Sequence, residues 1–408
     1  MVRELYINKI NEVALNVTQS KIDSIRKKTI IKSGCRVYDN GYIGVAGTLG
    51  EATEETWKAA EKNLENKVPY EFEPCGENKR VRDLRINSIT DEEFLQRAEM
   101  FLEEVRKEFP NFSLGNKIKV IEVEEAISND LGLEYKNLDR IFQLELTVKE
   151  KTSVAVFDTA FMRQDRDFNV DMLLSEIRNN LKAYNNLIDI PRGEKIPIIT
   201  NFYSVGGKII EALNGKELME GTSIFSKKLG EKKFCDDFTV VVDRSEENLC
   251  FPFFDAEGNI LENDKFALIE NGIIKNGYTD KKTASKYNIP NTAAAYASYD
   301  EVPSLDCIRI NDSRLSVESG NKTLKEILGD KEAIFIVFMQ GGECTNEGDF
   351  ASPVQMAYLM KDSEIVGRLP EFNVSGNIYE MFGQDYLGQS SDKPYFGDHG
   401  MVINIKVN

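Results

Sequence analysis

The sequence predicts an α+β fold, with a mixed α/β N-terminal domain over residues 1–190 and a β-rich C-terminal domain over residues 191–408. In the first part, segments with helical spacing of apolar residues alternate with segments of strand spacing. In the second part, short strand-like runs separated by turn residues dominate. Between the two parts, the stretch 189–197 places two prolines and a glycine among charged residues, which is typical of a domain boundary.

Strand patterns in the N-terminal part are interrupted by recognisable turns. Alternation of apolar and polar side chains favours strands within residues 12–17, 29–46, 117–124 and 141–149. The sequence Asp39-Asn-Gly predicts a hairpin turn, because Asn and Gly tolerate the left-handed backbone conformation that such a turn needs. A turn at Glu150–Lys151 is predicted to lead into an antiparallel strand at Thr152–Phe157.

Three segments of the N-terminal part predict helices, at residues 53–64, 91–109 and 170–186. Thr53 can cap the first of them, and Pro110 ends the second. The second helix is amphipathic, with one apolar face formed by Phe94, Ala98, Phe101, Leu102 and Val105.

The C-terminal part begins with an apolar run at Ile196–Tyr203, a Gly206–Gly207 pair and a segment with helical spacing. Strand, tight turn and helix is the predicted structure, and such a junction points backbone N–H groups at one spot. Further strands are predicted at 238–242, 266–270, 273–275, 334–339, 355–360, 364–369 and 401–407. Hairpin turns are predicted at 271–272 and 361–363, and short helices at 281–287 and 323–328.

Composition disfavours several classes of partner. The formal net charge of −17 repels phosphate backbones and anionic membranes, so we expect neither nucleic acid nor a membrane as a partner. A basic cluster at 79–85 is better explained as a solvated face or a protein contact. The six cysteines are scattered without a C-x-x-C motif, and the N-terminus lacks the apolar core of a signal peptide, so we expect a cytoplasmic protein with reduced thiols.

Several motifs, taken in order along the chain, are similar to those of the TldD/PmbA (TldE) family. This family comprises zinc-dependent peptidases and has also been described as modulators of DNA gyrase. The motifs that carry the resemblance are Gly34-Cys-Arg-Val, Gly41-Tyr-Ile-Gly-Val-Ala, Glu220-Gly-Thr-Ser-Ile-Phe-Ser, Thr239-Val-Val-Val-Asp, Phe254-Asp-Ala-Glu-Gly, Leu268-Ile-Glu-Asn-Gly-Ile-Ile-Lys, Gly341-Gly-Glu and Gly348-Asp-Phe-Ala-Ser.

The zinc motif of this family is missing from the sequence. Zinc-bearing members carry His-Glu-x-x-x-His before the Gly-Thr-Ser motif, and those positions fall here on Gly206, Gly207 and Glu211. The single histidine is His399 and the last cysteine is Cys344. The sequence therefore cannot supply the two histidines and the late cysteine with which zinc-bearing members hold the metal. The resemblance therefore implies the metal-less PmbA/TldE-like branch, with no catalytic residue, metal or other cofactor of its own.

The resemblance also implies a partner and a substrate class. Members of this branch associate with a TldD-like zinc-peptidase subunit, and the complex, expected to be a dimer, cleaves unfolded or small peptides. We therefore expect a non-catalytic subunit that helps to hold a peptide. Two alternatives remain open, namely an autonomous peptidase with an unrecognised site and a homo-oligomeric peptide-binding protein.

Two glycine pairs and the single histidine are the remaining candidates. Gly341, Gly342 and Glu343 are possible peptide contacts, because glycines beside a strand let another backbone come close, although a structural bulge explains them equally well. The Gly206–Gly207 pair is read as a turn rather than an anion cradle. His399 is expected to be an ordinary surface-turn histidine rather than the base of a Cys344–His399 pair.

Overall fold

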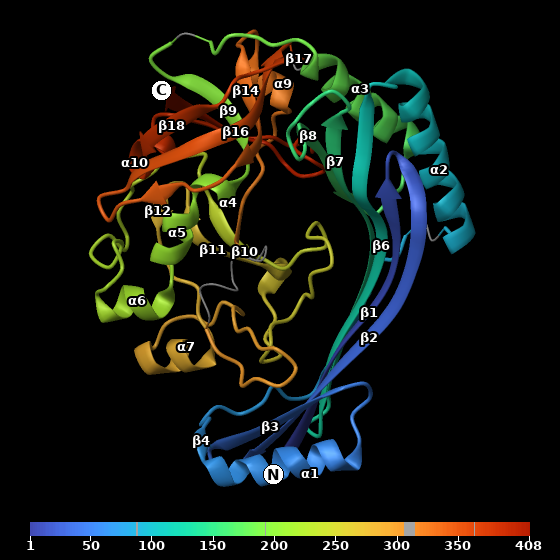
Figure 1. The fold of residues 1–408 in the computed structure, drawn as a ribbon. Helices are drawn as coiled ribbons and strands as arrows, with labels where there is room; N and C mark the ends of the chain where they lie inside the picture. Colours follow the sequence, from blue (N-terminus) through green and yellow to red (C-terminus); the bar gives the residue numbers. More distant parts are fainter. Residues whose placement is uncertain (87–88, 192, 306–314, 363) are drawn as a thin grey trace.

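The fold is described from a computed structural model, over residues 1–86, 89–191, 193–305, 315–362 and 364–408 (Figure 1). Helices and strands are both abundant, and the C-terminal part is rich in sheet, which confirms the predicted α+β class. None of the helices in the described ranges is long and apolar enough to cross a membrane. Cys307, and Ser363 of the predicted turn at 361–363, lie outside these ranges.

The N-terminal half is built on one eight-stranded sheet in the order β4-β3-β2-β1-β6-β7-β5, with β8 paired to β7. The four strands β1, β2, β6 and β7 are long and curve together along one side of the molecule, and we call them the arm (Figure 1). The strands are β1 Val2–Thr18, β2 Lys21–Asp39, β3 Tyr42–Leu49, β4 Val68–Pro69, β5 Asn78–Asp83, β6 Phe112–Asn129, β7 Leu133–Glu150 and β8 Thr159–Asp165.

Helices cover the two ends of the arm. Helix α1 (Glu54–Asn63), followed by a short 3₁₀ turn at Leu64–Asn66, lies at the lower end in Figure 1, whereas α2 (Asp91–Glu108) and α3 (Val170–Tyr184) lie at the upper end. All three helices were predicted. The predicted apolar face of α2 is buried, and Thr90 caps this helix by accepting a hydrogen bond from the backbone N–H of Glu93.

The predicted strand at Thr152–Phe157 is wrong, because this segment is a loop and β8 begins only at Thr159. The Asp158 carboxylate closes the loop by accepting hydrogen bonds from the Ser153 hydroxyl (2.6 Å) and the Glu150 N–H (2.7 Å). Val154 and Val156 are 103% and 90% exposed. Strand propensity depends on a neighbouring surface to pack against, and these side chains have none among the described residues.

The C-terminal half contains a closed ring of five strands, β14-β9-β20-β18-β16, because β16 also pairs with β14. Strand β15 pairs with β16, as does β17, and β19 pairs with β20. The strands are β9 Ile196–Thr200, β14 Ala333–Met339, β15 Glu343–Cys344, β16 Asp349–Lys361, β17 Glu364–Arg368, β18 Phe372–Asn377, β19 Tyr386–Gln389 and β20 Met401–Val407.

A second, four-stranded sheet in the order β12-β11-β10-β13 packs beside this barrel. Its strands are β10 Val240–Asp243, β11 Lys265–Glu270, β12 Ile273–Ile274 and β13 Leu315–Val317. The helices of this half are short, namely α4 Phe202–Val205, α5 Gly207–Ala212, α6 Gly215–Glu220, α7 Lys281–Tyr287, α9 Leu324–Leu328 and α10 Ile378–Met381, with a 3₁₀ turn at Glu262–Asp264.

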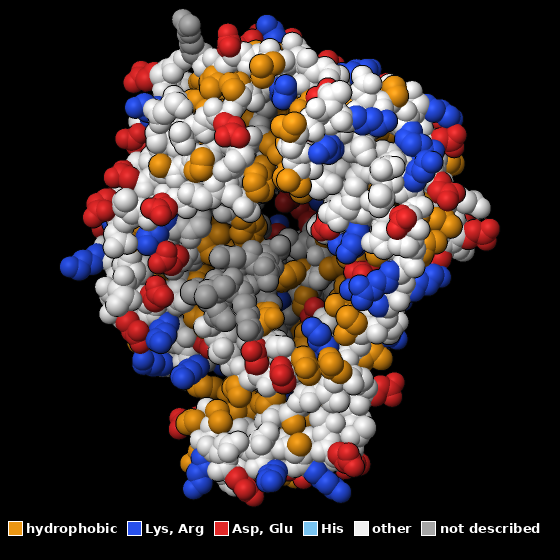
Figure 2. All heavy atoms as spheres, in the orientation of Figure 1, with side chains coloured by type: hydrophobic (Ala, Val, Ile, Leu, Met, Phe, Trp, Pro, Cys, Tyr) orange, Lys and Arg blue, Asp and Glu red, His pale blue; other side chains and the backbone are white. Residues whose placement is uncertain are grey.

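The arm touches the C-terminal half at both of its ends. At the upper end one hydrophobic cluster combines Phe142 and Leu144 of β7 with Phe335, Tyr358 and Val402 of the barrel. This core joins residues from both sides of position 190, and the division into two domains at that position stays a prediction. Between the two ends, Figure 2 shows a hollow in the surface.

At the lower end the contact between the arm and the C-terminal half is charged and buried. We call the group Glu4, Arg36, Tyr38, Tyr70 and Glu257 the lower contact; each of these residues is at most 7% exposed. A hydrogen bond from the Arg36 guanidinium to the carbonyl of Ala256 and one of 2.9 Å from the Tyr70 hydroxyl to Glu257 cross between the two halves. Tyr38 donates to Glu4 over 2.8 Å.

The basic cluster at 79–85 forms β5, a strand that runs parallel to β7 and was not predicted. Arg80 makes a two-bond ion pair with Asp264 (2.7 and 2.6 Å). The buried Arg82 donates to the carbonyls of Arg244 (2.7 Å) and Phe251 (2.6 Å). Two arginines of the cluster are therefore used within the chain, to fix the arm to the C-terminal half.

Candidate functional site

The segment from β9 to α5 has the predicted order of strand, turn and helix, with one additional helical turn. The strand ends at Thr200, and Asn201 caps α4 by accepting hydrogen bonds from the backbone N–H and the hydroxyl of Ser204, both 2.9 Å. Gly206 separates α4 from α5 and has a φ of −98°, so the left-handed conformation is not what requires a glycine there.

The two glycines of this turn have different surroundings. A Cβ at Gly206 would lie 2.2 Å from the Phe202 ring and 2.8 Å from the Phe202 carbonyl oxygen, which leaves no space for a side chain. A Cβ at Gly207 would meet no atom within 4 Å. The packing of the turn therefore requires Gly206, whereas Gly207 leaves space in front of α5.

In the second glycine pair, too, one position is tightly packed and the other is open. A Cβ at Gly342 would lie 2.8 Å from both Cβ and Oγ of Ser352 on the neighbouring strand β16. Gly341 has a φ of +88°, which favours glycine, but its only close neighbour would be a Pro353 carbon at 3.8 Å. The two residues after this pair form β15, which pairs with β16 through Glu343–Ala351 and Cys344–Phe350.

The structure brings these two glycine regions to one groove of about 410 Å³. Five of the six residues singled out in the sequence line it, namely Gly207, Glu211, Gly341, Gly342 and Glu343. Gly206, the sixth, lies beside the groove without lining it. The remaining lining residues are Tyr203, Ser204, Val205, Lys208, Met339, Gln340, Cys344, Phe350 and Ser352. One wall is thus α4 and α5, and the other is the edge strand β15 with the glycine segment before it.

The charged side chains of the groove are Lys208, Glu211 and Glu343. Lys208 and Glu211 form an ion pair of 3.1 Å on one side of α5, with side chains 13% and 56% exposed. Burial raises the pKa of the Cys344 thiol, and the negative charges of Asp349 and Glu211 add to this, while Lys208 opposes it. The thiol is therefore held in its protonated, weakly nucleophilic form.

The residues of the groove do not fit a zinc ion. Two of the three positions that would carry the family's zinc motif are glycines without a donor atom, and Phe202 occupies the space that a side chain at position 206 would need. Glu211 alone remains, and its carboxylate is already paired with Lys208. A search of the described ranges finds no group of three His, Cys, Asp or Glu side chains that could hold a metal ion.

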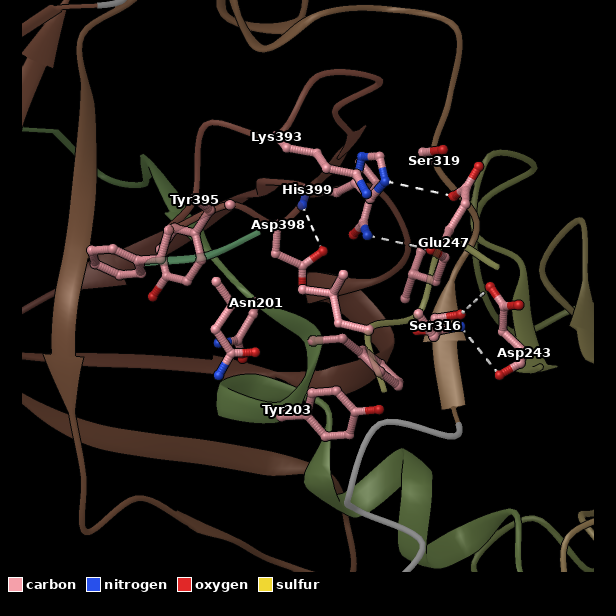
Figure 3. Close-up of a pocket in the computed structure, with 18 of the residues that line it drawn as sticks. Asn201, Tyr203, Asp243, Glu247, Ser316, Ser319, Lys393, Tyr395, Asp398 and His399 are labelled. Atoms are coloured by element: carbon pink, nitrogen blue, oxygen red, sulfur yellow. Dashed lines mark hydrogen bonds and ion pairs between the residues drawn. The ribbon is translucent and has the colours of Figure 1, made fainter. Parts of the chain in front are cut away.

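A second cavity, of about 380 Å³, lies between the arm and the C-terminal half, and we call it the central cavity (Figure 3). Its wall includes residues 143–145 and 162–164 of β7 and β8, residues 243 and 247–249 after β10, 315–319 around β13, and 393–399 before β20. Tyr203 of α4 lines both the groove and the central cavity, so the two hollows share a wall.

His399 lies in this cavity and its side chain is only 15% exposed, so the prediction of a surface histidine is wrong. Its Nδ1 is 2.7 Å from the carbonyl oxygen of Ser390, and its Nε2 is 3.9 Å from a carboxylate oxygen of Glu247 (Figure 3). Cys344 lines the groove and not this cavity, so the structure does not bring together the nucleophile–base pair considered from the sequence.

Sequence reasoning missed the central cavity. Glu247, Asp243 and Ser316 come from segments without a motif for a polar site, and Asp243 is positioned by hydrogen bonds from Ser316 (3.2 Å) and the Ser245 N–H (2.8 Å). Only the three-dimensional packing of the arm against three separate C-terminal segments brings these groups together. No pattern along the chain could have indicated this.

Comparisons with known proteins agree with the fold. Residues 194–400 match the sequence model of the PmbA/TldA metallopeptidase C-terminal domain. A metalloprotease of Archaeoglobus fulgidus is 20% identical over 425 aligned positions, which cover 98% of this chain and 95% of that protein. A zinc metalloprotease TldD homolog of Saccharolobus solfataricus is 27% identical over 268 positions, covering 59% and 57%.

A solved structure has the same fold over the whole chain. The crystal structure of TldE from Thermococcus kodakarensis superposes with a TM-score of 0.78 and 18% sequence identity, covering 100% of this chain and 96% of the other. At a sequence identity of 18%, this similarity shows that the two proteins share a fold.

Proposed function

The chain belongs to the TldD/PmbA family of metallopeptidase-related proteins, and from that premise we propose that it is a TldE-like, non-catalytic subunit. It binds an extended stretch of an unfolded or small peptide, and a TldD-like partner supplies the zinc and the hydrolytic chemistry. The scattered cysteines, which form no C-x-x-C motif, favour the cytoplasm as its location.

The groove between α5 and β15 is the observation that carries this proposal. In this groove α5 faces the edge strand β15. The two motif positions at the start of α5, Gly206 and Gly207, have no side-chain atoms that could bind a metal. Phe202 also closes the space at position 206. A groove of this kind can bind and orient a peptide, but among the described residues it lacks a set of ligands for a zinc ion that would activate a water molecule.

An added strand is the mode of binding that the groove supports best. Strand β15 pairs on one edge with β16 and ends its sheet among the described strands, so its other edge can accept a peptide backbone. The open space at Gly207 and the lack of a Cβ at Gly341 allow that backbone to come close. Met339 and Phe350 offer apolar contacts for its side chains.

Contact with a catalytic subunit follows from the lack of chemistry in the groove. A chain of this kind contributes to cleavage only by binding, orienting or restricting access to the peptide, and each of these roles requires the zinc subunit to be adjacent. We expect a dimer whose interface includes the β-rich C-terminal half.

The proposal is tested by purifying the chain with and without a TldD-like protein from the same host. We expect co-purification as a dimer in light scattering, no stoichiometric zinc in the dialysed chain alone, and casein hydrolysis by the complex only. Chelator-insensitive hydrolysis by the chain alone would instead support an autonomous peptidase. Peptide binding by a homo-oligomer, with neither partner nor turnover, would support a peptide-binding protein. One tightly held zinc per chain would contradict the proposal.

A further inference from the structure

In the central cavity, His399 and the carboxylate of Glu247 face each other, and none of the described residues donates a hydrogen bond to both. A carbonyl oxygen can only accept, so the contact of 2.7 Å between Ser390 O and His399 Nδ1 requires the proton on Nδ1. In its neutral form, the imidazole ring then presents an unprotonated Nε2 to the cavity. Figure 3 shows this nitrogen directed toward the carboxylate of Glu247.

The distance between these two acceptors, 3.9 Å, is too long for a direct hydrogen bond. Both acceptors are satisfied when one group donates a hydrogen bond to each of them. A primary ammonium group has three N–H donors and a positive charge, so it can contact the imidazole and the carboxylate at once.

The charges around the pair favour the same kind of ligand. The carboxylates of Glu318 and Asp398 also line the cavity, and Figure 3 shows Asp398 and Lys393 near His399. The other two cations of the lining, Arg163 and Lys265, have carboxylate partners at 2.5 Å in Glu176 and 3.5 Å in Asp243. Among the described residues that line the cavity, carboxylates therefore outnumber cations.

The position of the cavity connects this pair with the groove. Tyr203 lines both hollows, so a peptide that lies along β15 has the central cavity on the other side of this side chain. Leu249, Leu315 and Tyr395 add apolar surface to the cavity, which suits the aliphatic part of an amine.

We propose that the central cavity binds a primary ammonium group of the peptide, held by the carboxylate of Glu247 and Nε2 of His399. The inference rests on the proposed peptide-binding function. The ammonium group is either the α-amino terminus or a lysine side chain, because both have the same donors and charge. Glu247 and His399 are then specificity-determining residues and take no part in hydrolysis.

The single histidine of the chain allows a direct test, because ¹⁵N-histidine labelling gives the imidazole signals of His399 alone. In the free protein at pH 7.5 we expect the nitrogen shifts of a neutral ring with the proton on Nδ1. On addition of tetra-alanine amide, the Nε2 signal is expected to move as it accepts a hydrogen bond. An imidazolium ring in the free protein would mean that His399 itself pairs with the Glu247 carboxylate, and would overturn the inference.

Calorimetry with three peptides then identifies the source of the ammonium group. We expect tetra-alanine amide to bind about 10- to 100-fold more tightly than its Nα-acetylated form, as for hydrogen bonds to charged groups. An Nα-acetylated peptide with one lysine that regains this affinity would identify the side chain as the ligand. Glu247→Gln should remove the preference, whereas Glu246→Gln, an exposed neighbour that does not line the cavity, should keep it.

The outcomes separate the two proposals. Equal affinity for all three peptides would overturn the ammonium site and leave peptide binding in the groove intact. No measurable binding of any peptide to the chain, alone or with its partner, would contradict the proposed function and the ammonium site together.

Discussion

The groove and the lower contact both lie where family-like motifs occur in the sequence, yet they are built in opposite ways. The groove is formed by missing side chains, at Gly207 and Gly341, and contains few charged groups. The lower contact is filled by Arg36, Glu4 and Glu257, which are 0%, 1% and 2% exposed. A motif of small residues here leaves open space at the surface, whereas a motif of charged residues fixes one part of the fold to another.

The difference has an energetic consequence. Removing a partner from a buried ionic cluster leaves the other charge unpaired, so the lower contact should be sensitive to single substitutions. The groove has open space on its ligand side and tight packing behind it, so its sensitivity should depend on which glycine is changed. The following substitutions test this contrast.

The largest effect is expected for Arg36→Met in the lower contact. This change leaves the Glu4 carboxylate buried without its cation and removes the hydrogen bond to the Ala256 carbonyl. We expect the free energy of unfolding to fall by about 4 kcal/mol, measured by urea denaturation. Arg26→Met, at an exposed position on the same strand, should change it by less than about 0.5 kcal/mol. Equal effects of the two variants would contradict the role of the lower contact.

The two glycines before and at the start of α5 should respond in opposite directions. Gly206→Ala places a methyl group against the ring and the carbonyl of Phe202, and we expect a loss of about 3 kcal/mol of stability. Gly207→Ala has open space and a helical backbone, so it should stabilise the protein by about 0.5 kcal/mol. Thermal unfolding of both variants measures the difference. If neither substitution changed the stability, Phe202 would not pack tightly against position 206.

The lower contact should also make stability depend on pH. Burial, followed by the negative charge of Asp255, raises the pKa of Glu257 to about 7, while a hydrogen bond from the Lys281 N–H opposes this rise. The folded protein therefore holds this proton more tightly than the unfolded chain, where glutamate titrates near its ordinary value of about 4.3. The stabilising contribution is complete below that value and is lost as the pH rises through 7.

The size of this pH effect is about 4 kcal/mol, from about 1.4 kcal/mol per pKa unit. It is measured as the difference in unfolding free energy between the wild type and Glu257→Gln at pH 5, 6, 7 and 8. We expect the wild type to lose stability relative to the variant as the pH rises, and Glu246→Gln to serve as the control. A difference that is constant over this range would show that Glu257 does not titrate there.

Local patterns in the sequence were sufficient for much of this architecture. The apolar face of α2, the capping residue Thr53 of α1 and the Asn40–Gly41 turn depend on neighbours within a few residues, and there the prediction and the structure agree. The strand β5 was missed because contacts with distant segments decide it, whereas the loop at Thr152–Phe157 was missed because its side chains have no neighbouring surface to pack against among the described residues. In β5 these contacts are the Arg80 and Arg82 bonds to the C-terminal half.

The groove and the central cavity also differ in how far the sequence could predict them. The residues of the groove could be selected from the sequence, because the resemblance marks the motif positions on α5 and a glycine pair marks the approach to β15. The central cavity gathers single residues such as His399, Glu247 and Gln143 from distant parts of the chain. Each of them has ordinary neighbours in sequence, so only their placement in space reveals the site.

The smallest change in stability, with the clearest change in function, is expected for Gly207→Leu. The side chain enters the open space in front of α5 and occupies the groove, so it should weaken the binding of an unstructured peptide at least about 10-fold. Stability should change by less than about 0.5 kcal/mol, because no atom lies within 4 Å of the new Cβ. Peptide affinity is measured by fluorescence anisotropy, and stability by urea unfolding of the same sample.

The matched control is Gly76→Leu, since Gly76 also has open space around its Cβ position but lines neither the groove nor the central cavity. This variant should bind the peptide like the wild type. If both leucine variants bind normally, the peptide does not pass in front of α5. If both lose affinity, the effect is not specific to the groove. Weakened binding in Gly207→Leu alone, at unchanged stability, is the result that distinguishes a ligand groove from a cleft that only packing requires.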